Sequence, residues 1–390
     1  MTVGTPRPPL VNRALLLVFV ASFGAMTGFF LLLSVVPLYA DSVGAGGVGA
    51  GLTTGVLMAA TVAGELAVPR LTDRFGYRAV FAAGLVLLGA PALALPASTT
   101  LAAILAVSVV RGLGFAIVVV VGGAMVASLV PGERRGEGLG LFGIVVGVPG
   151  VAALPLGVWL VGETGYPAVF AAGAAAALAG LAVMPGLPGR APRQEAPVGV
   201  LAGLRTPDLV WPAAAFAVAA TAAGVVVTFL PLATGGSGRL AAVALFVQAA
   251  ASTSTRWWAG RHGDRHGPAV LLVPGVVATA AGMATLVLID RPAAVLAGMA
   301  LFGCGFGVTQ IATMTVMLSR VAPSGFGTVS AIWNLAYDLG IGAGAFGFGV
   351  VAAQTGYPAA FVVTAGLVLA GLVPVWLDRR RPARSGCIHS

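Results

Sequence analysis

The chain has 390 residues, of which 58% are hydrophobic and only 8% are charged, and this balance excludes a water-soluble globular protein. All 21 basic residues are arginine, and the formal net charge is +9. The arginines stand in short segments beside long apolar runs, as they do in membrane proteins, so no nucleic-acid partner is expected.

Twelve apolar runs follow one another along the chain. About 20 apolar helical residues, rising about 1.5 Å each, cross a hydrocarbon core of about 30 Å. The runs cover residues 14–39, 47–69, 79–97, 101–126, 138–161, 166–185, 209–232, 240–258, 269–289, 293–318, 328–352 and 357–377. They are continuous rather than alternating, which favours helices over barrel strands. We predict an all-α membrane protein with twelve transmembrane helices, the first too long for the core of a cleaved signal peptide.

The placement of arginine predicts the orientation. With the N-terminus inside the cell, 18 arginines fall in cytoplasmic segments, Arg239 and Arg291 fall outside, and Arg111 lies within a helix. Positively charged residues are retained on the cytoplasmic side of a membrane. The pattern predicts a multi-pass protein of the inner (plasma) membrane with both termini in the cytoplasm.

A long internal repeat divides the chain. The segment Gly-Tyr-Pro-Ala at residues 165–168 recurs at 356–359, and the same offset of 191 residues relates Asp73 to Asp264 and Gly112 to Gly303. We therefore predict two pseudo-symmetric six-helix bundles, residues 1–185 and 208–390, the second with a short cytoplasmic tail. Residues 186–207, rich in Pro, Gly and Arg, are predicted to be a cytoplasmic linker. Two parallel repeats around a midplane cavity suit transport by alternating access.

A signature loop occurs once in each half. Residues 70–78 read RLTDRFGYR and residues 260–267 read GRHGDRHG. The two loops resemble the cytoplasmic signature of the major facilitator superfamily, although Pro69 stands where that family usually has glycine. The resemblance implies a gate that latches one conformation, and the residues assigned to it are Asp73, Arg74, Gly76, Arg78, Asp264, Arg265 and Gly267. The alternative for these charges is simple loop solvation and topology.

Two further segments resemble parts of the same family. Residues 111–116, RGLGFA, are loosely similar to its Arg-x-x-x-Gly pattern. The fifth run contains Gly143, Gly147, Pro149, Gly150, Pro155 and Gly157 and resembles the glycine- and proline-rich helix of drug and sugar exporters. Val148 stands where a glycine usually precedes the proline, which weakens the likeness to exporters. Exporter-like relatives imply proton-driven antiport.

Two deep charges of opposite sign mark the two halves. Arg111 lies about ten residues into the fourth run, and Asp338 lies at a similar depth in the eleventh. Charges at such depth are costly and usually functional, so we expect Asp338 and Arg111 to couple transport to protons. The alternative is a permanent structural pair. Glu65 and Arg256 are shallower, related by the same offset, and expected to serve the gate or the structure.

Polar and aromatic residues within the runs are candidates for the substrate cavity. They are Thr27, Thr221, Gln248, Gln310, Trp333, Asn334 and Tyr337. Polar side chains are unfavourable toward lipid and are expected to face the bundle interior. The alternative is ordinary helix packing, with hydrogen bonds that hold helices together.

Metal, cofactor and enzyme chemistry find no support in the sequence. His262 and His266 bracket Asp264, but no third good ligand stands nearby. No nucleotide-binding P-loop and no convergent nucleophile, base and orienting group are present. The expected protein is a monomeric transporter, not an enzyme, with a small-molecule substrate and protons as partners and no cofactor. Efflux is the leading hypothesis, and a proton-coupled nutrient importer and a non-transporting sensor are the alternatives.

Overall fold

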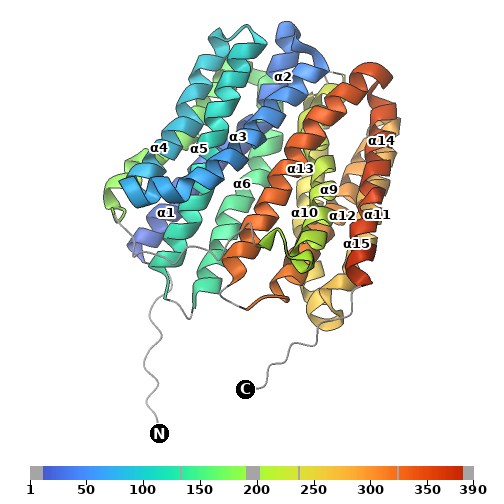
Figure 1. Cartoon of the computed structure of the whole chain (residues 1–390). Helices are drawn as coiled ribbons and strands as arrows, with labels where there is room; N and C mark the ends of the chain where they lie inside the picture. Colours follow the sequence, from blue (N-terminus) through green and yellow to red (C-terminus); the bar gives the residue numbers. More distant parts are fainter. Residues whose placement is uncertain (1–11, 132–133, 190–202, 236–237, 323–324, 381–390) are drawn as a thin grey trace, which may run out of the picture. The chain divides into compact units, whose positions relative to one another are not determined.

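The computed structural model describes residues 12–131, 134–189, 203–235, 238–322 and 325–380, and the regular structure within these ranges is helical (Figure 1). The elements are α1 (Arg13–Leu33), α2 (Val35–Ala40), η1 (Asp41–Ala45), α3 (Gly46–Phe75), α4 (Tyr77–Gly89), η2 (Ala90–Ala97), α5 (Leu101–Leu129), α6 (Arg135–Thr164), α7 (Tyr166–Leu178), η4 (Ala179–Gly186), α9 (Pro207–Ala233), α10 (Gly238–His266), η5 (Pro268–Leu271), α11 (Leu272–Thr285), η6 (Leu286–Leu288), α12 (Pro292–Leu318), α13 (Phe326–Thr355), α14 (Tyr357–Ala370) and α15 (Leu372–Arg379). The prediction of an all-α membrane fold is confirmed for the described residues.

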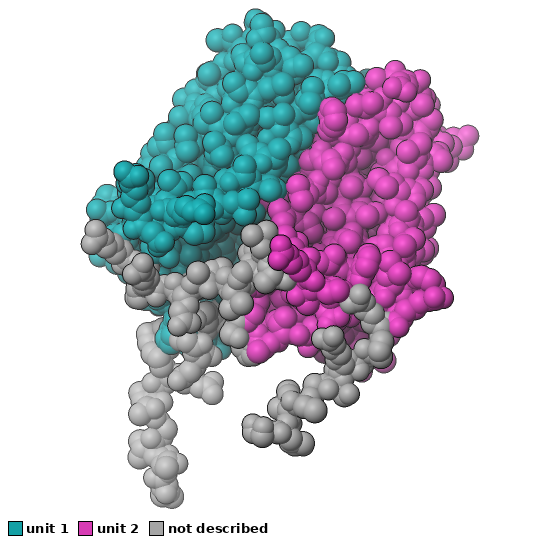
Figure 2. Space-filling model, viewed as in Figure 1, with its two compact units in different colours: residues 1–195, 235–242 teal, residues 196–234, 243–390 magenta. Residues whose placement is uncertain are grey.

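The chain divides into two compact units, shown by colour in Figure 2. Unit 1 comprises Met1–Glu195 and Gly235–Ala242, and unit 2 comprises Ala196–Thr234 and Val243–Ser390. In unit 1, α1 packs on α6, and α4 packs on α5 and α7. In unit 2, α9 packs on α13, and α11 packs on α12 and α14. The predicted domain boundaries at 185 and 208 stay a prediction, because residues 190–202 of the linker lie outside the described residues.

Ten helical stretches of the described residues are long and apolar enough to cross a membrane. The first of them, Arg13–Phe75, has 63 residues and contains two of the predicted runs. It is interrupted at Gly44 and Gly46, whose φ angles are 91° and 64°, and α2 packs beside α3, so the chain turns back at this point. This stretch accounts for two crossings.

Helix α10 is the remaining predicted crossing, and it falls outside those ten stretches. It contains the whole run 240–258 and has 29 residues, enough to span about 43 Å at about 1.5 Å per residue. Polar residues between Gln248 and Arg256 lower its hydropathy. Counting α10 and the two crossings of the first stretch gives the predicted twelve.

The same glycine contacts hold helices together in both units. In unit 1, a Cβ added at Gly112 of α5 would lie 2.2 Å from the carbonyl oxygen of Leu57 in α3. In unit 2, a Cβ added at Gly303 of α12 would lie 2.4 Å from the carbonyl oxygen of Gln248 in α10. The offset of 191 residues relates Gly112 to Gly303 and Leu57 to Gln248. The repeat in the sequence is therefore a repeat of helix packing, with small residues that allow backbones to approach closely.

The turns between helices repeat in the same register. Gly44 and Gly235, Gly76 and Gly267, and Gly165 and Gly356 have positive φ angles between 61° and 91°, and each pair is 191 residues apart. No residue other than glycine has a positive φ among those described. Because side chains rarely adopt this conformation, glycine at these positions is required by the turn.

Many large apolar side chains are exposed on the two units. Examples are Leu16 and Ile144 in unit 1 and Phe246 and Val363 in unit 2, each at least half exposed. Exposed apolar surface of this extent is unfavourable in water and favourable in lipid. The exposed apolar surface and the helix lengths therefore both indicate a lipid bilayer.

Candidate functional site

Asp338 is a buried carboxylate in the middle of a long helix. It is the thirteenth of the 30 residues of α13, and its exposed fraction is 4%. Two residues further on, a Cβ added at Gly340 would lie 2.4 Å from the carbonyl oxygen of Ala217 in α9. The Asp338 carboxylate therefore lies close to the point where α9 and α13 pack tightly against each other.

An aromatic cluster of unit 2 lies along the same helix. The ring centroid of Phe216 in α9 is 4.2 Å from that of Trp333, 5.8 Å from that of Tyr337 and 6.0 Å from that of Phe306, and all three pairs are stacked. The Trp333 indole also donates a hydrogen bond to Thr313 Oγ1 of α12 at 3.3 Å. Three helices therefore build one stack of flat rings. Trp333 and Tyr337 were predicted as cavity residues, whereas Phe216 and Phe306 were not, because phenylalanine in an apolar run carries no signal of its own.

The charge of Arg256 in α10 acts on one ring of this cluster. Its guanidinium is close enough to the Tyr337 phenol for an electrostatic interaction, and it donates a hydrogen bond to Thr253 Oγ1 at 3.0 Å. Glu65, its counterpart in the repeat, is half-buried on α3 of unit 1. The predicted gate residue Arg256 and the predicted cavity residue Tyr337 thus interact electrostatically.

Arg111 is the largest fully buried side chain among those described. It is the eleventh of the 29 residues of α5, and its exposed fraction is 1%. Its Nε donates a hydrogen bond to the Leu88 carbonyl at 3.3 Å, whereas its two terminal nitrogens have no acceptor among the described residues. Arg111 is one of the residues that line a hollow of about 10 Å³, here called the Arg111 hollow. Its other lining residues are Leu32, Leu33, Val36, Pro37, Thr53, Thr54, Leu57 and Ser108.

The other predicted cavity residues are half-buried. The Thr27 hydroxyl donates to the Phe23 carbonyl at 2.8 Å, and the Thr221 hydroxyl donates to the Val218 carbonyl at 2.7 Å, each within its own helix. Gln248, Gln310 and Asn334 are also half-buried, on α10, α12 and α13. Gln310, Asn334 and Thr221 belong to the helices that build the aromatic cluster.

The two signature loops have the same local form. Gly76 ends α3 with a φ of 80°, and Gly267 follows α10 with a φ of 85°. Asp73 and Asp264 are exposed, and neither carboxylate makes an ion pair within the described part of the chain. The flanking side chains of Arg74, Arg78 and Arg265 are exposed as well. The gate role of these residues stays a prediction.

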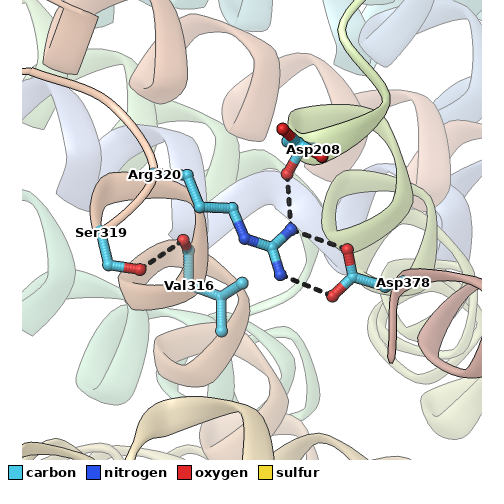
Figure 3. Close-up of polar contacts among 5 residues, drawn as sticks. All are labelled: Asp208, Val316, Ser319, Arg320 and Asp378. Carbon is cyan, nitrogen blue, oxygen red and sulfur yellow. Dashed lines mark hydrogen bonds and ion pairs between the residues drawn. The ribbon is translucent and has the colours of Figure 1, made fainter. Parts of the chain in front are cut away.

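A charged cluster at the helix ends of unit 2 was missed by the sequence analysis. Figure 3 shows Arg320, just after α12, donating two hydrogen bonds to the Asp378 carboxylate of α15, at 2.7 and 2.8 Å. The same guanidinium donates to the Asp208 carbonyl of α9 at 2.7 Å. Asp378 is 7% exposed, so the carboxylate of this bidentate pair is buried, whereas the Arg320 side chain is 29% exposed. An acidic residue directly after the last apolar run was the signal available in the sequence.

A match to a family model establishes the family of this chain. The model described as the Major Facilitator Superfamily matches residues 18–345. The chain belongs to the Major Facilitator Superfamily. A search of curated proteins finds no match.

Solved structures of Major Facilitator Superfamily proteins have the same fold. The nucleoside transporter NupG superposes with a TM-score of 0.76 at 14% identity, over 95% of this chain and 100% of that one. A bacterial homologue of the human lysosomal transporter Spinster, inward-facing and occupied, gives 0.80 at 16% identity over 96% and 98%. The xylose transporter XylE from E. coli gives 0.75 at 14% identity over 95% and 98%. This Major Facilitator Superfamily member is thus a multi-pass membrane transporter rather than an enzyme.

Proposed function

We propose that this protein exports a small organic molecule in exchange for protons by alternating access. Asp338 is the proton-carrying residue in this proposal, and Arg111 is the second charge of the coupling machinery. The substrate cavity is formed by the seven polar and aromatic residues named from the sequence, and the signature loops with Glu65 and Arg256 form the cytoplasmic gate. The transporter works as a monomer.

The observation that carries the proposal is the buried carboxylate of Asp338. An ionisable residue in the interior of a membrane helix is costly and usually belongs to a proton or substrate path. The offset of 191 residues places Gly147 at the equivalent position of α6. Because one repeat folds with glycine there, packing alone does not account for the carboxylate in the other.

The direction of transport rests on α6. Pro149 and Pro155 lie inside this helix, as in the exporter-like pattern that it resembles. A Cβ added at Gly143 or Gly147 would meet no described atom within 4 Å, so packing within the unit does not require glycine at either position. Glycine at positions where packing does not require it supports a role in helix motion.

The aromatic cluster indicates the kind of molecule carried. Trp333 and Tyr337 are its half-buried members, and flat ring faces stack with aromatic and apolar groups, while the charge of Arg256 acts on the Tyr337 phenol. The half-buried amides of Gln310 and Asn334 add hydrogen-bonding capacity on the same helices. A planar, amphipathic organic molecule fits this surface best.

Proton-coupled import is a second candidate function. One structural relative, at 14% identity and a TM-score of 0.77, is a D-xylose-proton symporter. An importer would use the same fold and the same coupling carboxylate. The sign of substrate movement in sealed vesicles with an imposed pH gradient separates the two functions.

The substitution Asp338→Asn tests the coupling role, because the amide keeps the shape of the side chain and removes its titration. We expect vesicles with this variant to lose pH-driven accumulation of a fluorescent amphipathic cation such as ethidium, or of another dye that the wild type is first found to move. Downhill exchange of the same dye should persist.

The matched control is Asp290→Asn, which changes an exposed carboxylate between helices and should transport normally. Uphill transport at the normal level in Asp338→Asn would show that Asp338 is structural. Glu65 would then be the next carboxylate to test.

A further inference from the structure

We propose that the Arg111 hollow in unit 1 binds one small monovalent anion, either a free halide ion or the carboxylate end of an organic anion. The two sources share one chemistry, a single negative charge that accepts hydrogen bonds from the guanidinium. The inference concerns binding and does not rest on the proposed direction or coupling of transport.

The guanidinium lacks a counter-charge within its surroundings. Its two terminal nitrogens are buried and have no acceptor among the described residues, and no carboxylate is found among the residues that line the hollow. The single hydrogen bond to the Leu88 carbonyl engages only Nε. Because an uncompensated buried charge is strongly unfavourable, an anion held by the two terminal nitrogens would offset a large cost.

The size of the hollow limits the occupant. A volume of about 10 Å³ is close to that of a single water-sized sphere. Among common anions, a halide ion or the oxygen end of a carboxylate needs the least enlargement of this volume, whereas a sulfonate or a phosphate needs the most. The proposed site therefore favours small anions.

The other half of the repeat provides an internal control. The offset of 191 residues maps the four polar residues of the Arg111 hollow onto apolar residues of unit 2, whereas Leu57 of the hollow corresponds to Gln248. The counterparts of Arg111, Ser108, Thr53 and Thr54 are Phe302, Met299, Ala244 and Leu245, and all four are fully buried. The same helix packing is thus achieved with apolar side chains, so the polar set of unit 1 is not a requirement of the fold.

Two hydroxyl groups complete the polar side of the hollow. The Ser108 hydroxyl donates to the Ile104 carbonyl at 2.9 Å, and the Thr53 hydroxyl donates to the Ala50 carbonyl at 2.7 Å. Both hydroxyls donate to carbonyl groups of their own helices, and rotation about the Cα–Cβ bond redirects them. Arg111 supplies the charge, and these hydroxyls add donors when an anion enters.

Thermal unfolding of the purified full-length protein tests the site. Sodium isethionate, whose sulfonate is too large for the hollow, is replaced stepwise by chloride, bromide or acetate at constant ionic strength. We expect a saturable rise of a few degrees in the unfolding midpoint, because a ligand that binds only the folded state stabilises it. A rise with chloride and bromide alone identifies a halide site, and a rise with acetate identifies a carboxylate site. Equal midpoints in all four salts would overturn the proposal.

Variants locate the effect at Arg111. Arg111→Gln should weaken the apparent affinity at least about tenfold, because it removes the charge that holds the anion. Arg239→Gln, which changes an arginine of unit 1 that is 85% exposed, should keep the wild-type response.

A second variant covers the case in which Arg111→Gln does not fold. Ser108→Val places extra methyl volume in the hollow while Arg111 stays, and it should weaken the same response at least about tenfold. A wild-type response in either folded variant would contradict the proposed site.

Discussion

Arg111 and Phe302 occupy equivalent positions of the repeat, and both are fully buried. Asp338 and Gly147 form a second such pair with a charge in one half only. The fold accepts an apolar residue or glycine at each position. A charged side chain at either position carries the cost of burial without being required by the fold. Its presence therefore indicates a functional role for that residue.

The Arg320 cluster is a case in which a buried charge is fully paired. We expect Asp378→Asn to lower the stability by about 1–3 kcal/mol, because it leaves the partly buried guanidinium with a carbonyl but no carboxylate. The midpoint of thermal unfolding measures the effect. Glu163→Gln is the matched control, since its ion pair with Arg239 is 3.6 Å long and exposed and should contribute no more than about 0.5 kcal/mol. An unchanged midpoint in Asp378→Asn would show that the pair contributes nothing to stability.

Pairs of helices are held by contacts between backbones. The pairs α3 with α5 and α10 with α12 meet at Gly112 and Gly303, where any side chain would collide with a carbonyl oxygen. A backbone atom cannot move aside as a flexible side chain does. The spacing of the helices therefore depends on these two glycines.

We expect Gly112→Ala to lower stability by about 1–3 kcal/mol, since the new methyl group must push α3 and α5 apart. Gly303→Ala should act equally on α10 and α12, and thermal unfolding measures both. Gly162→Ala is the control on α6, where a Cβ meets no described atom within 4 Å, and it should be neutral or stabilising by up to about 1 kcal/mol. A loss in the control as large as in Gly112→Ala would refute the steric explanation.

At the scale of the whole molecule, the chain is two similar units joined in sequence. The family match from 18 to 345 runs through both of them. Likeness to nucleoside and xylose transporters at 14% identity reflects the shared fold alone. The shared fold by itself therefore does not identify the substrate.

The arginine distribution predicts that both termini face the cytoplasm. Reporter fusions at each end, one reporter active only in the cytoplasm and one active only outside, measure the orientation. We expect activity of the cytoplasmic reporter alone at both ends, because an even number of crossings returns the chain to its starting side. Outside activity at the C-terminus alone would require an odd number of crossings and would refute the twelve-helix topology.

The sequence by itself determined the membrane class, the helical runs, the repeat and the family. These properties depend on local hydropathy and on spacing along the chain, and both follow directly from the order of the residues. It also singled out Arg111, Asp338, Trp333 and Tyr337, because charged and polar aromatic residues are conspicuous within apolar runs.

Only the tertiary structure decided which side chains meet. It placed Phe216 and Phe306 against Trp333, joined Arg320 to Asp378 across 58 residues of chain, and lined the Arg111 hollow with Thr53 and Ser108. Such contacts depend on the rotation of each helix about its axis and on the depth at which neighbouring helices pack. Glycines such as Gly112 and Gly303 fix that depth, and their effect on distant residues appears only when the helices are assembled.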